Sequence, residues 1–175
     1  PSDSPAASEE PDVAMGVFPL FLDPDLRPEQ DGEGANDSKY PQVSCDGEVV
    51  YLAWQDLRTP PKWDVYFNRS TDGGATWLLQ DLRLDGGIGD SYSPRIASSG
   101  SNVYVAWVDD RTVKNKWDVY FNCSSDGGTT WLPQDVRVNT TPPGTKVAGE
   151  VQIACSGLSV YIAWMDRRNG LEDIY

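Results

Sequence analysis

Three long segments of the chain are apolar at almost every position. They cover residues 48–54, 102–107 and 159–164, and each ends in a tryptophan. A strand with one face in water alternates apolar and polar residues, whereas a continuous apolar run indicates a strand that is covered on both faces. We therefore predict three strands, each inside a sheet that packs between neighbouring sheets.

Shorter strand patterns surround each long one, and turns rich in Gly and Pro separate them. First strands are predicted at 41–44, 94–97 and 151–154, third strands at 63–68, 117–122 and 173–175, and fourth strands at 76–84 and 130–138. The sets of four antiparallel strands recur every 53 to 57 residues. A repeat of this length predicts an all-β protein made of similar stacked sheets.

One turn pattern, Ser-x-Asp-x-Gly-x-Thr-Trp, occurs twice, between the predicted third and fourth strands. Its residues are Ser70, Asp72, Gly74, Thr76 and Trp77 in one copy, and Ser124, Asp126, Gly128, Thr130 and Trp131 in the other. An Asp carboxylate accepts backbone N–H groups of its own turn, Gly permits positive φ, and Trp covers the turn with apolar surface. The pattern predicts a structural role.

With these two turns the chain resembles the Asp-box (BNR-repeat) β-propellers of the sialidase superfamily, over roughly residues 20–175. The resemblance implies blades of four antiparallel strands, about three per chain. It also implies that the Asp boxes lie opposite the face where family members bind ligands. A Greek-key sandwich is the alternative fold, but it gives no reason for such a repeat.

The sequence begins with a fourth-strand pattern and stops on a third-strand pattern, and this order predicts the domain organisation. Residues 1–17 are expected to be a flexible leader, 18–39 a donated outer strand with its linker, 40–90 blade 1, 91–148 blade 2 and 149–175 an incomplete blade 3. The donated strand would complete a last blade, in this chain or in a neighbouring one. Three outcomes stay open: a six-bladed ring of two chains, a head-to-tail fibre, or a fragment of a longer propeller.

Composition narrows the classes of partner. The net charge is −13 and the sequence pI about 4.2, which disfavours nucleic acid and anionic membrane surfaces. No apolar run approaches the ~20 residues that span a bilayer, so we expect no membrane insertion. The chain has no His, and no pattern predicts a metal or a cofactor. These features favour a secreted or cell-surface protein, extracellular or periplasmic.

The three cysteines bear on assembly. Cys45 and Cys155 occupy equivalent positions at the ends of the first strands of blades 1 and 3, and Cys123 replaces Arg69 of the repeat. Within one chain a whole blade separates Cys45 from Cys155, which is too far for a disulfide. A head-to-tail contact would make them neighbours, so they are either an interchain disulfide or free thiols.

A second repeated motif, Trp-x-Asp-x-Arg, follows each long strand and is expected on the face opposite the Asp boxes. Its acidic and basic residues are Asp56, Arg58, Asp109, Arg111, Asp166 and Arg168. These side chains are candidates for binding a polar ligand such as a sugar. Alternatively, each Asp pairs with its own Arg as part of the packing, and the presence of the motif in all three blades favours this alternative.

Sialidases use three arginines, a Tyr–Glu nucleophile pair and an Asp acid/base. Arg95, in Ser-Pro-Arg-Ile-Ala, is the nearest match to their first arginine motif, and Gln42 and Gln152 stand at its equivalents. No catalytic residue can therefore be assigned. The predicted function is a non-catalytic extracellular module that self-associates by exchanging its N-terminal strand, as a homo-oligomer or a fibre. The alternatives are a carbohydrate-binding module that binds glycans and a fragment of a sialidase-like glycosidase.

Overall fold

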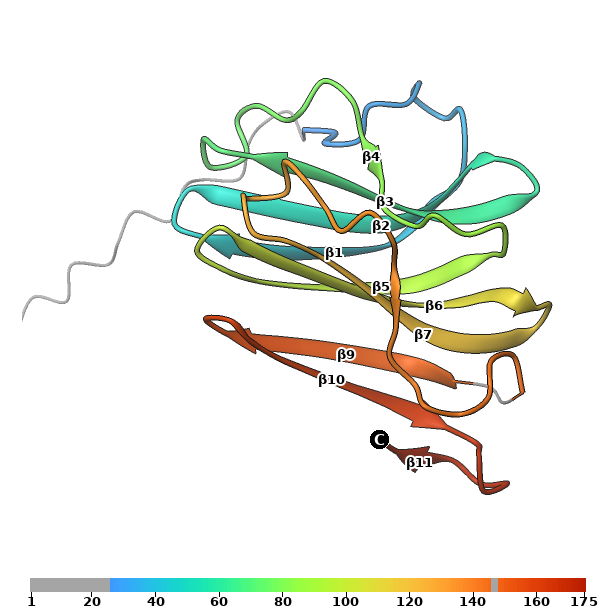
Figure 1. Cartoon of the computed structure of the whole chain (residues 1–175). Coiled ribbons are helices and arrows are strands. Elements are labelled where there is room, and N and C mark those ends of the chain that lie inside the picture. Colours follow the sequence, from blue (N-terminus) through green and yellow to red (C-terminus); the bar gives the residue numbers. More distant parts are fainter. Residues whose placement is uncertain (1–25, 146–147) are drawn as a thin grey trace, which may run out of the picture.

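The computed structural model describes residues 26–145 and 148–175, and its regular elements are all β-strands (Figure 1). Blade 1 consists of β1 (Ser38–Asp46), β2 (Val49–Thr59), β3 (Lys62–Ser70) and β4 (Leu82–Arg83). Blade 2 consists of β5 (Ser91–Ser99), β6 (Asn102–Val113), β7 (Lys116–Ser124) and β8 (Val136–Arg137). Blade 3 consists of β9 (Ala148–Ser156), β10 (Ser159–Asp166) and β11 (Asp173–Ile174). The predicted leader and most of the predicted donated strand lie outside the described residues.

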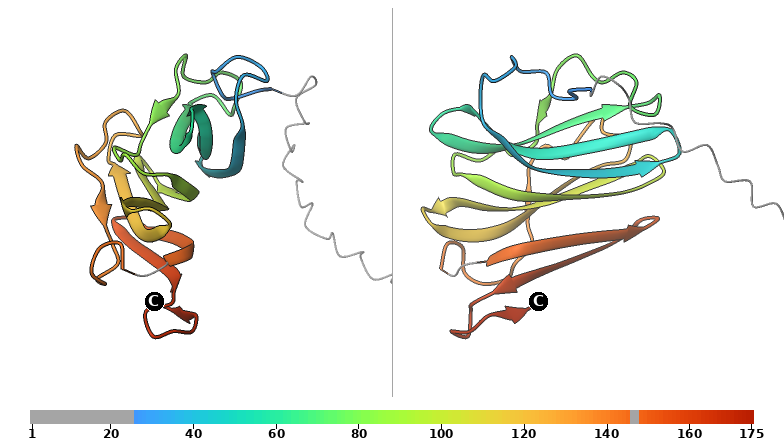
Figure 2. Two further views of the ribbon diagram at one scale, coloured as in Figure 1. Left: turned by 90° about the vertical axis from the view of Figure 1, so that its right-hand side faces the viewer. Right: turned by 180° about the vertical axis from the view of Figure 1, so that it is seen from behind.

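Each blade is an antiparallel sheet whose strands follow one another in sequence order. The three sheets stack like the leaves of a fan, with blade 2 in the middle (Figures 1 and 2). The first strands β1, β5 and β9 contact one another in turn, so they form the inner side of the fan. The prediction of about three propeller-type blades is confirmed. Within the described residues no helix is available to cross a membrane.

The core lies between the blades, as the continuous apolar strands predict. Tyr51 and Phe67 of blade 1 pack in one cluster with Val105 and Trp107 of blade 2. Tyr51 and its blade 2 equivalent, Tyr104, are 2% and 6% exposed. The tyrosine at the same position in blade 3, Tyr161, is 66% exposed. Blades 1 and 2 are thus covered by the blade that follows them, whereas the far face of blade 3 is open.

The fourth strands are much shorter than predicted, since only two residues of each pair with the third strand. The Asn68 side chain accounts for the difference. It accepts the N–H of Leu78 at 2.9 Å and donates to the carbonyl of the same residue at 3.2 Å. Asn122 bonds Leu132 in the same way in blade 2. Besides these side-chain bonds, the N–H groups of Leu78 and Leu132 each donate to one third-strand carbonyl at 3.2 Å, and regular ladder pairing begins only at Leu82 and Val136.

Candidate functional site

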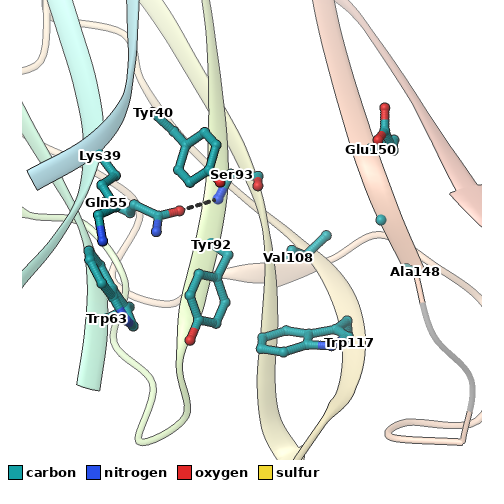
Figure 3. A pocket seen from close by; sticks show the side chains of 11 residues that line it. Lys39, Tyr40, Gln55, Trp63, Tyr92, Ser93, Val108, Trp117, Ala148 and Glu150 are labelled. Carbon is teal, nitrogen blue, oxygen red and sulfur yellow. Dashed lines mark hydrogen bonds between the residues drawn. The ribbon is translucent and has the colours of Figure 1, made fainter. Parts of the chain in front are cut away.

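An open cleft of about 490 Å³ lies at the end of the blades where the first and third strands begin (Figure 3). All three blades line it. The lining residues are Lys39, Tyr40, Gln55, Trp63, Tyr92, Ser93, Val108, Trp117, Ala148, Gly149 and Glu150. The Asp-box turns follow the ends of β3 and β7, so they lie at the opposite end of the same strands.

The inner strands that line the cleft share a strained backbone position. Tyr40, Ser93 and Glu150 stand at equivalent places in the three blades, with φ values of 55°, 52° and 51°. In β1, β5 and β9 the pairing with the second strand shifts register at this point, which marks a β-bulge. Positive φ is costly for residues other than Gly, and such strain concentrates at functional sites. The bulge thus falls at three cleft-lining residues that carry a phenol, a hydroxyl and a carboxylate.

Aromatic rings form the middle of the cleft. The rings of Trp63 and Tyr92 lie 6.2 Å apart, and Trp117 meets Tyr92 edge-on at 4.9 Å. The Lys39 ammonium lies 4.8 Å from the Trp63 ring. Burial, followed by the nearby charge of Asp90, raises the pKa of Tyr92, so its hydroxyl stays protonated at neutral pH. The cleft therefore offers half-buried aromatic surfaces with hydrogen-bonding groups around them.

A hydrogen bond between blades fixes the side of the cleft nearest blade 1. The Ser93 backbone N–H donates to the Gln55 side-chain oxygen at 2.9 Å (Figure 3). Gln55 is buried and lies on β2, so it ties the bulge of blade 2 to the neighbouring sheet. The strained segment is thereby held in place before any ligand arrives. Preorganisation of this kind reduces the entropic cost of binding.

The first Asp-box turn satisfies its hydrogen bonds internally. The Asp72 carboxylate accepts the N–H of Thr76 at 2.8 Å, its hydroxyl at 2.6 Å and the hydroxyl of Ser70 at 2.7 Å. These bonds lower the pKa of Asp72 to about 2, and the bond from the Thr76 hydroxyl has the largest effect. The Gly74 N–H donates to Ser70, and the Trp77 indole donates to the Gly74 carbonyl. Every residue of the pattern thus has a bond within the turn.

The second Asp-box turn repeats this geometry. Asp126 accepts the N–H and hydroxyl of Thr130 at 2.8 and 2.7 Å and the hydroxyl of Ser124 at 2.7 Å. These bonds, led by that from the Thr130 hydroxyl, hold the pKa of Asp126 well below its ordinary value. Trp131 meets Phe67 of blade 1 edge-on at 5.0 Å, so this turn also packs against the neighbouring blade. None of the Asp-box residues lines the cleft.

The Trp-x-Asp-x-Arg motif lies within the strands of blades 1 and 2, rather than in a loop after them. Arg58 bonds Asp56 at 2.6 Å and Asp81 at 2.9 Å, and its guanidinium lies 3.9 Å from the Tyr66 ring. Burial alone would raise the pKa of Asp56, but hydrogen bonds from Arg58 and Trp54 outweigh it and lower the pKa. In blade 1 the motif therefore forms a closed network of ion pairs.

Blade 2 carries the same network, and blade 3 carries its first ion pair. Arg111 bonds Asp109 at 2.6 Å and Asp135 at 2.8 Å, and Arg168 bonds Asp166 at 2.8 Å. The three aspartates of the motif are fully buried. The structure brings none of the six charged residues of the motif to the cleft.

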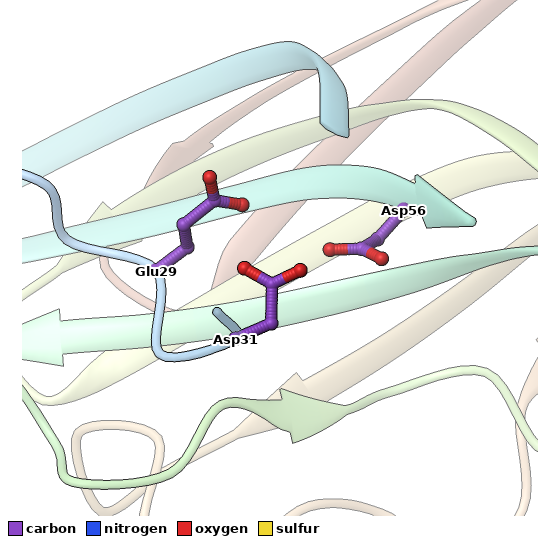
Figure 4. Close-up of side chains that lie close together, drawn as sticks. All are labelled: Glu29, Asp31 and Asp56. Atoms are coloured by element: carbon purple, nitrogen blue, oxygen red, sulfur yellow. The ribbon is translucent and has the colours of Figure 1, made fainter. Parts of the chain in front are cut away.

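Glu29, Asp31 and Asp56 lie close together at the edge of blade 1, with carboxylate oxygens within 4.8 Å of one another (Figure 4). Arg27 donates to Glu29 at 3.1 Å and also bonds the Asp31 carboxylate. Arg58 bonds Asp56. These two guanidinium groups offset the negative charge of the cluster, and we assign it no ligand.

All three cysteines are free thiols in the single chain, and Cys45 is exposed. Burial raises the pKa of the Cys123 and Cys155 thiols, so both are protonated at neutral pH. The interchain Cys45–Cys155 disulfide stays a prediction.

The sequence did not indicate the cleft. Trp63 and Trp117 belong to the repeated strand motif, which gives no sign that they face a cavity. Tyr40 and Ser93 each precede a proline, and a residue in that position is biased toward extended backbone. Local sequence therefore predicts the opposite sign of φ at both residues. Only the register between the strands reveals the bulge.

Comparison with known proteins agrees with the architecture. No protein-family model and no curated protein sequence matches the chain. Among solved structures, the chain is similar to the Penicillium chrysogenum alpha-L-arabinanase, with a TM-score of 0.53 and 15% identity over 79% of this chain and 43% of that one. Zg3597, a family 117 glycoside hydrolase from Zobellia galactanivorans, gives a TM-score of 0.52 at 9% identity over 82% of this chain and 52% of that one.

The Hadza microbial sialidase Hz136 is a third similar structure, with a TM-score of 0.51 and 16% identity. The match covers 82% of this chain and 32% of the sialidase. The chain thus spans about half or less of these proteins, which are β-propeller glycoside hydrolases and sialidases. At such low identity the likeness shows the fold alone, namely the β-propeller.

Proposed function

We propose that the chain is a carbohydrate-binding β-propeller module and that the aromatic cleft is its binding site. The observation that supports this most is the set of bulges at Tyr40, Ser93 and Glu150. The three blades share the same strained backbone there, yet each carries a different side chain. Residues that serve packing alone recur from blade to blade. Side chains that differ on one common backbone are those expected to contact a ligand.

The chemistry of the cleft fits a sugar chain. The C–H face of a pyranose or furanose ring packs on an aromatic face, as Trp63, Tyr92 and Trp117 provide. Sugar hydroxyls are both donors and acceptors, and they match the carboxylate of Glu150 and the hydroxyl of Ser93. Because the chain carries a net charge of −13, we propose a neutral oligosaccharide rather than an anionic one.

Binding is a better account of the cleft than hydrolysis. Most glycoside hydrolases use a pair of carboxyl groups that flank the scissile bond. Glu150 is the only acidic residue that lines the cleft in the part of the chain that the structure describes. We therefore assign no catalytic residue, and we propose a secreted or cell-surface protein, because that is where it would meet polysaccharides.

Calorimetric titration with neutral oligosaccharides (arabinan, xylan and glucan fragments) tests this function. Trp117→Ala is expected to weaken binding about two- to tenfold, because one stacked aromatic contributes about 0.5–1.5 kcal/mol. Trp77→Ala is the matched control, since it removes a half-buried tryptophan at the opposite end. Equal losses in both variants, or no binding of any neutral oligosaccharide to the wild-type chain, would contradict the proposal.

A second candidate function, self-association, is supported by the open face of blade 3. Tyr161 is 66% exposed there, whereas its equivalents Tyr51 and Tyr104 are buried against the next blade. An uncovered sheet with an unpaired edge promotes association. We propose that a second copy covers this face, in a six-bladed ring or a head-to-tail fibre. Further blades of a longer chain would cover it equally well, and the experiment below separates these cases.

A further inference from the structure

The arginine of the fourth strand makes a repeated set of contacts in blade 1. Arg83 bonds Asp85, two residues later, at 3.2 Å, and it donates to the carbonyl of Gly87, four residues later, at 3.0 Å. Its third contact is across the sheet, to Asp64 of β3 at 2.7 Å. Asp64 is fully buried by this arrangement.

Blade 2 contains the same arrangement. Arg137 of β8 donates to the carbonyl of Thr141, four residues later, at 2.7 Å, and pairs with Asp118 of β7 at 3.5 Å. Asp118 is 1% exposed. An arginine on the fourth strand and an aspartate on the third therefore form a cross-strand pair in each complete blade.

Arg27 makes the same contacts to residues two and four positions later, but among the described residues it has no aspartate across a third strand. It bonds Glu29, two residues later, at 3.1 Å, and it donates to the carbonyl of Asp31, four residues later. The Gln30 N–H donates to Asp81 of blade 1 at 2.8 Å, as the Gly86 N–H donates to Asp135 of blade 2 at 3.0 Å. Residues 26–30 thus contact blade 1 as residues 82–86, which include the fourth strand of blade 1, contact blade 2.

Blade 3 has the complementary deficiency. In the strand register, Asp173 of β11 stands opposite Asp166 of β10, as Asp64 of β3 stands opposite Asp56 of β2 in blade 1. Asp173 is nevertheless exposed, and no fourth strand lies beside β11 among residues 26–145 and 148–175. Residues 26–30 lie beside blade 1, where Gln30 bonds Asp81, whereas β11 lies at the other end of the stack of blades (Figure 1), so Arg27 does not reach Asp173 within one chain in this fold.

We propose that Arg27 of one copy pairs with Asp173 of a second copy, which adds Leu26 and Arg27 to β11 as a fourth strand. This interface rests on the second candidate function above. Tyr66 lies opposite Arg83 in blade 1, and Tyr120 lies opposite Arg137 in blade 2. By the same register, Tyr175 lies opposite Arg27 of the second copy. Charge complementarity and the repeated register are what identify a second copy as the occupant.

The same contact gives the open face of blade 3 its cover. The Tyr51 hydroxyl donates to the carbonyl of Gly100 at 3.5 Å, and the Tyr104 hydroxyl donates to the carbonyl of Gly157 at 3.2 Å. In both cases the acceptor is the glycine of the first hairpin of the next blade. The exposed Tyr161 hydroxyl is expected to donate in the same way to Gly47 of the second copy, whose hairpin is also exposed.

Charge reversal tests the interface. We expect light scattering on the full chain to give a mass of at least twice 19.3 kDa. Arg27→Asp and Asp173→Arg should each weaken association more than about tenfold, because each places like charges opposite one another. Mixing the two variants should restore the wild-type mass, since each variant then meets an opposite charge at both contacts. Lys116→Asp, at an exposed residue of blade 2, is the matched control and should leave the mass unchanged.

Three results would overturn the interface: a monomeric wild-type chain, single variants that keep the wild-type mass, or a mixture that stays monomeric. Circular dichroism of each variant checks that it is folded. Oligosaccharide titration of the same variants keeps the two functions apart, because the cleft contains neither Arg27 nor Asp173.

Discussion

The two ends of the blades are built on different principles. At the Asp-box end, blades 1 and 2 repeat both the residues and the hydrogen bonds, so that Asp72 and Asp126 have the same partners. At the bulges of the cleft end, the blades repeat the backbone conformation but not the side chains, although Trp63 and Trp117 beside the bulges do recur. The repeated residues of the Asp-box end maintain the blade, whereas the different residues on the repeated bulge are available for binding.

The two ends also differ in where they place positive φ. At the Asp-box end it falls on glycines such as Gly74 and Gly128, which adopt it freely. At the cleft end it falls on Tyr40, Ser93 and Glu150, at a cost of about 1–2 kcal/mol each. The first end therefore contributes stability, while the second retains strain that the rest of the blade must offset.

The largest expected effect is at the Asp-box end, where Gly128→Ala should destabilise the fold by about 2–5 kcal/mol. About 1–2 kcal/mol comes from the left-handed backbone and about 1–3 kcal/mol from overpacking. A Cβ at Gly128 would lie 2.5 Å from Cζ of the buried Phe67 ring. Chemical denaturation measures the change.

Gly74→Ala is the matched control for this substitution. Gly74 has a φ of 95°, but a Cβ there would come no nearer than 4.0 Å to the Trp77 ring. Only the backbone cost of about 1–2 kcal/mol is then expected. Equal losses for the two variants would show that the second turn does not pack against blade 1 as described.

A smaller effect, of opposite sign, is expected at the cleft end. Glu150→Gly should stabilise the fold by about 0.5–1 kcal/mol. Glycine adopts the positive φ without the strain that Glu150 carries, and this gain exceeds the cost of the greater backbone entropy of glycine in the unfolded chain. It should also weaken oligosaccharide binding by removing the carboxylate. Denaturation and titration of the same preparation measure both changes. A loss of stability would show that the bulge is not strained.

The smallest effect is the acid response of the Asp-box turns. The pKa of Asp72 is about 2 in the folded chain, against an ordinary value of 3.8, and that of Asp126 is also lowered. A lowered folded-state pKa means that the charged turns stabilise the fold above about pH 4 and lose this contribution as pH falls through the folded value. The variant Asp72→Asn with Asp126→Asn should therefore show a shallower loss of stability between pH 4 and 2. An unchanged slope would contradict this.

The strands and turns were predictable because their signals are local. Continuous apolar runs place β2, β6 and β10 inside a stack, and the glycines of the Asp boxes mark the tight turns. The length of the fourth strands was not predictable, because the Asn68 and Asn122 amides bond the backbone of residues ten positions away, before ladder pairing begins.

The cleft was not predictable for a different reason. It forms where three bulges from separate blades meet, and each bulge is a property of register between strands rather than of local sequence. The prolines after Tyr40 and Ser93 even favour the other backbone region. By contrast, the pairing of Asp with Arg in the Trp-x-Asp-x-Arg motif was one of the two interpretations that the repeat allowed, and the contacts agree with it.

A proton–nitrogen NMR titration of the seven tryptophan indoles with a neutral oligosaccharide tests most directly whether the cleft binds sugar. If the cleft is the binding site, the signals of Trp63 and Trp117 shift in proportion to saturation, while those of Trp77 and Trp131 at the Asp-box end stay in place. Shifts confined to Trp77 and Trp131, or no shift with any neutral oligosaccharide, would contradict the assignment of binding to the cleft end.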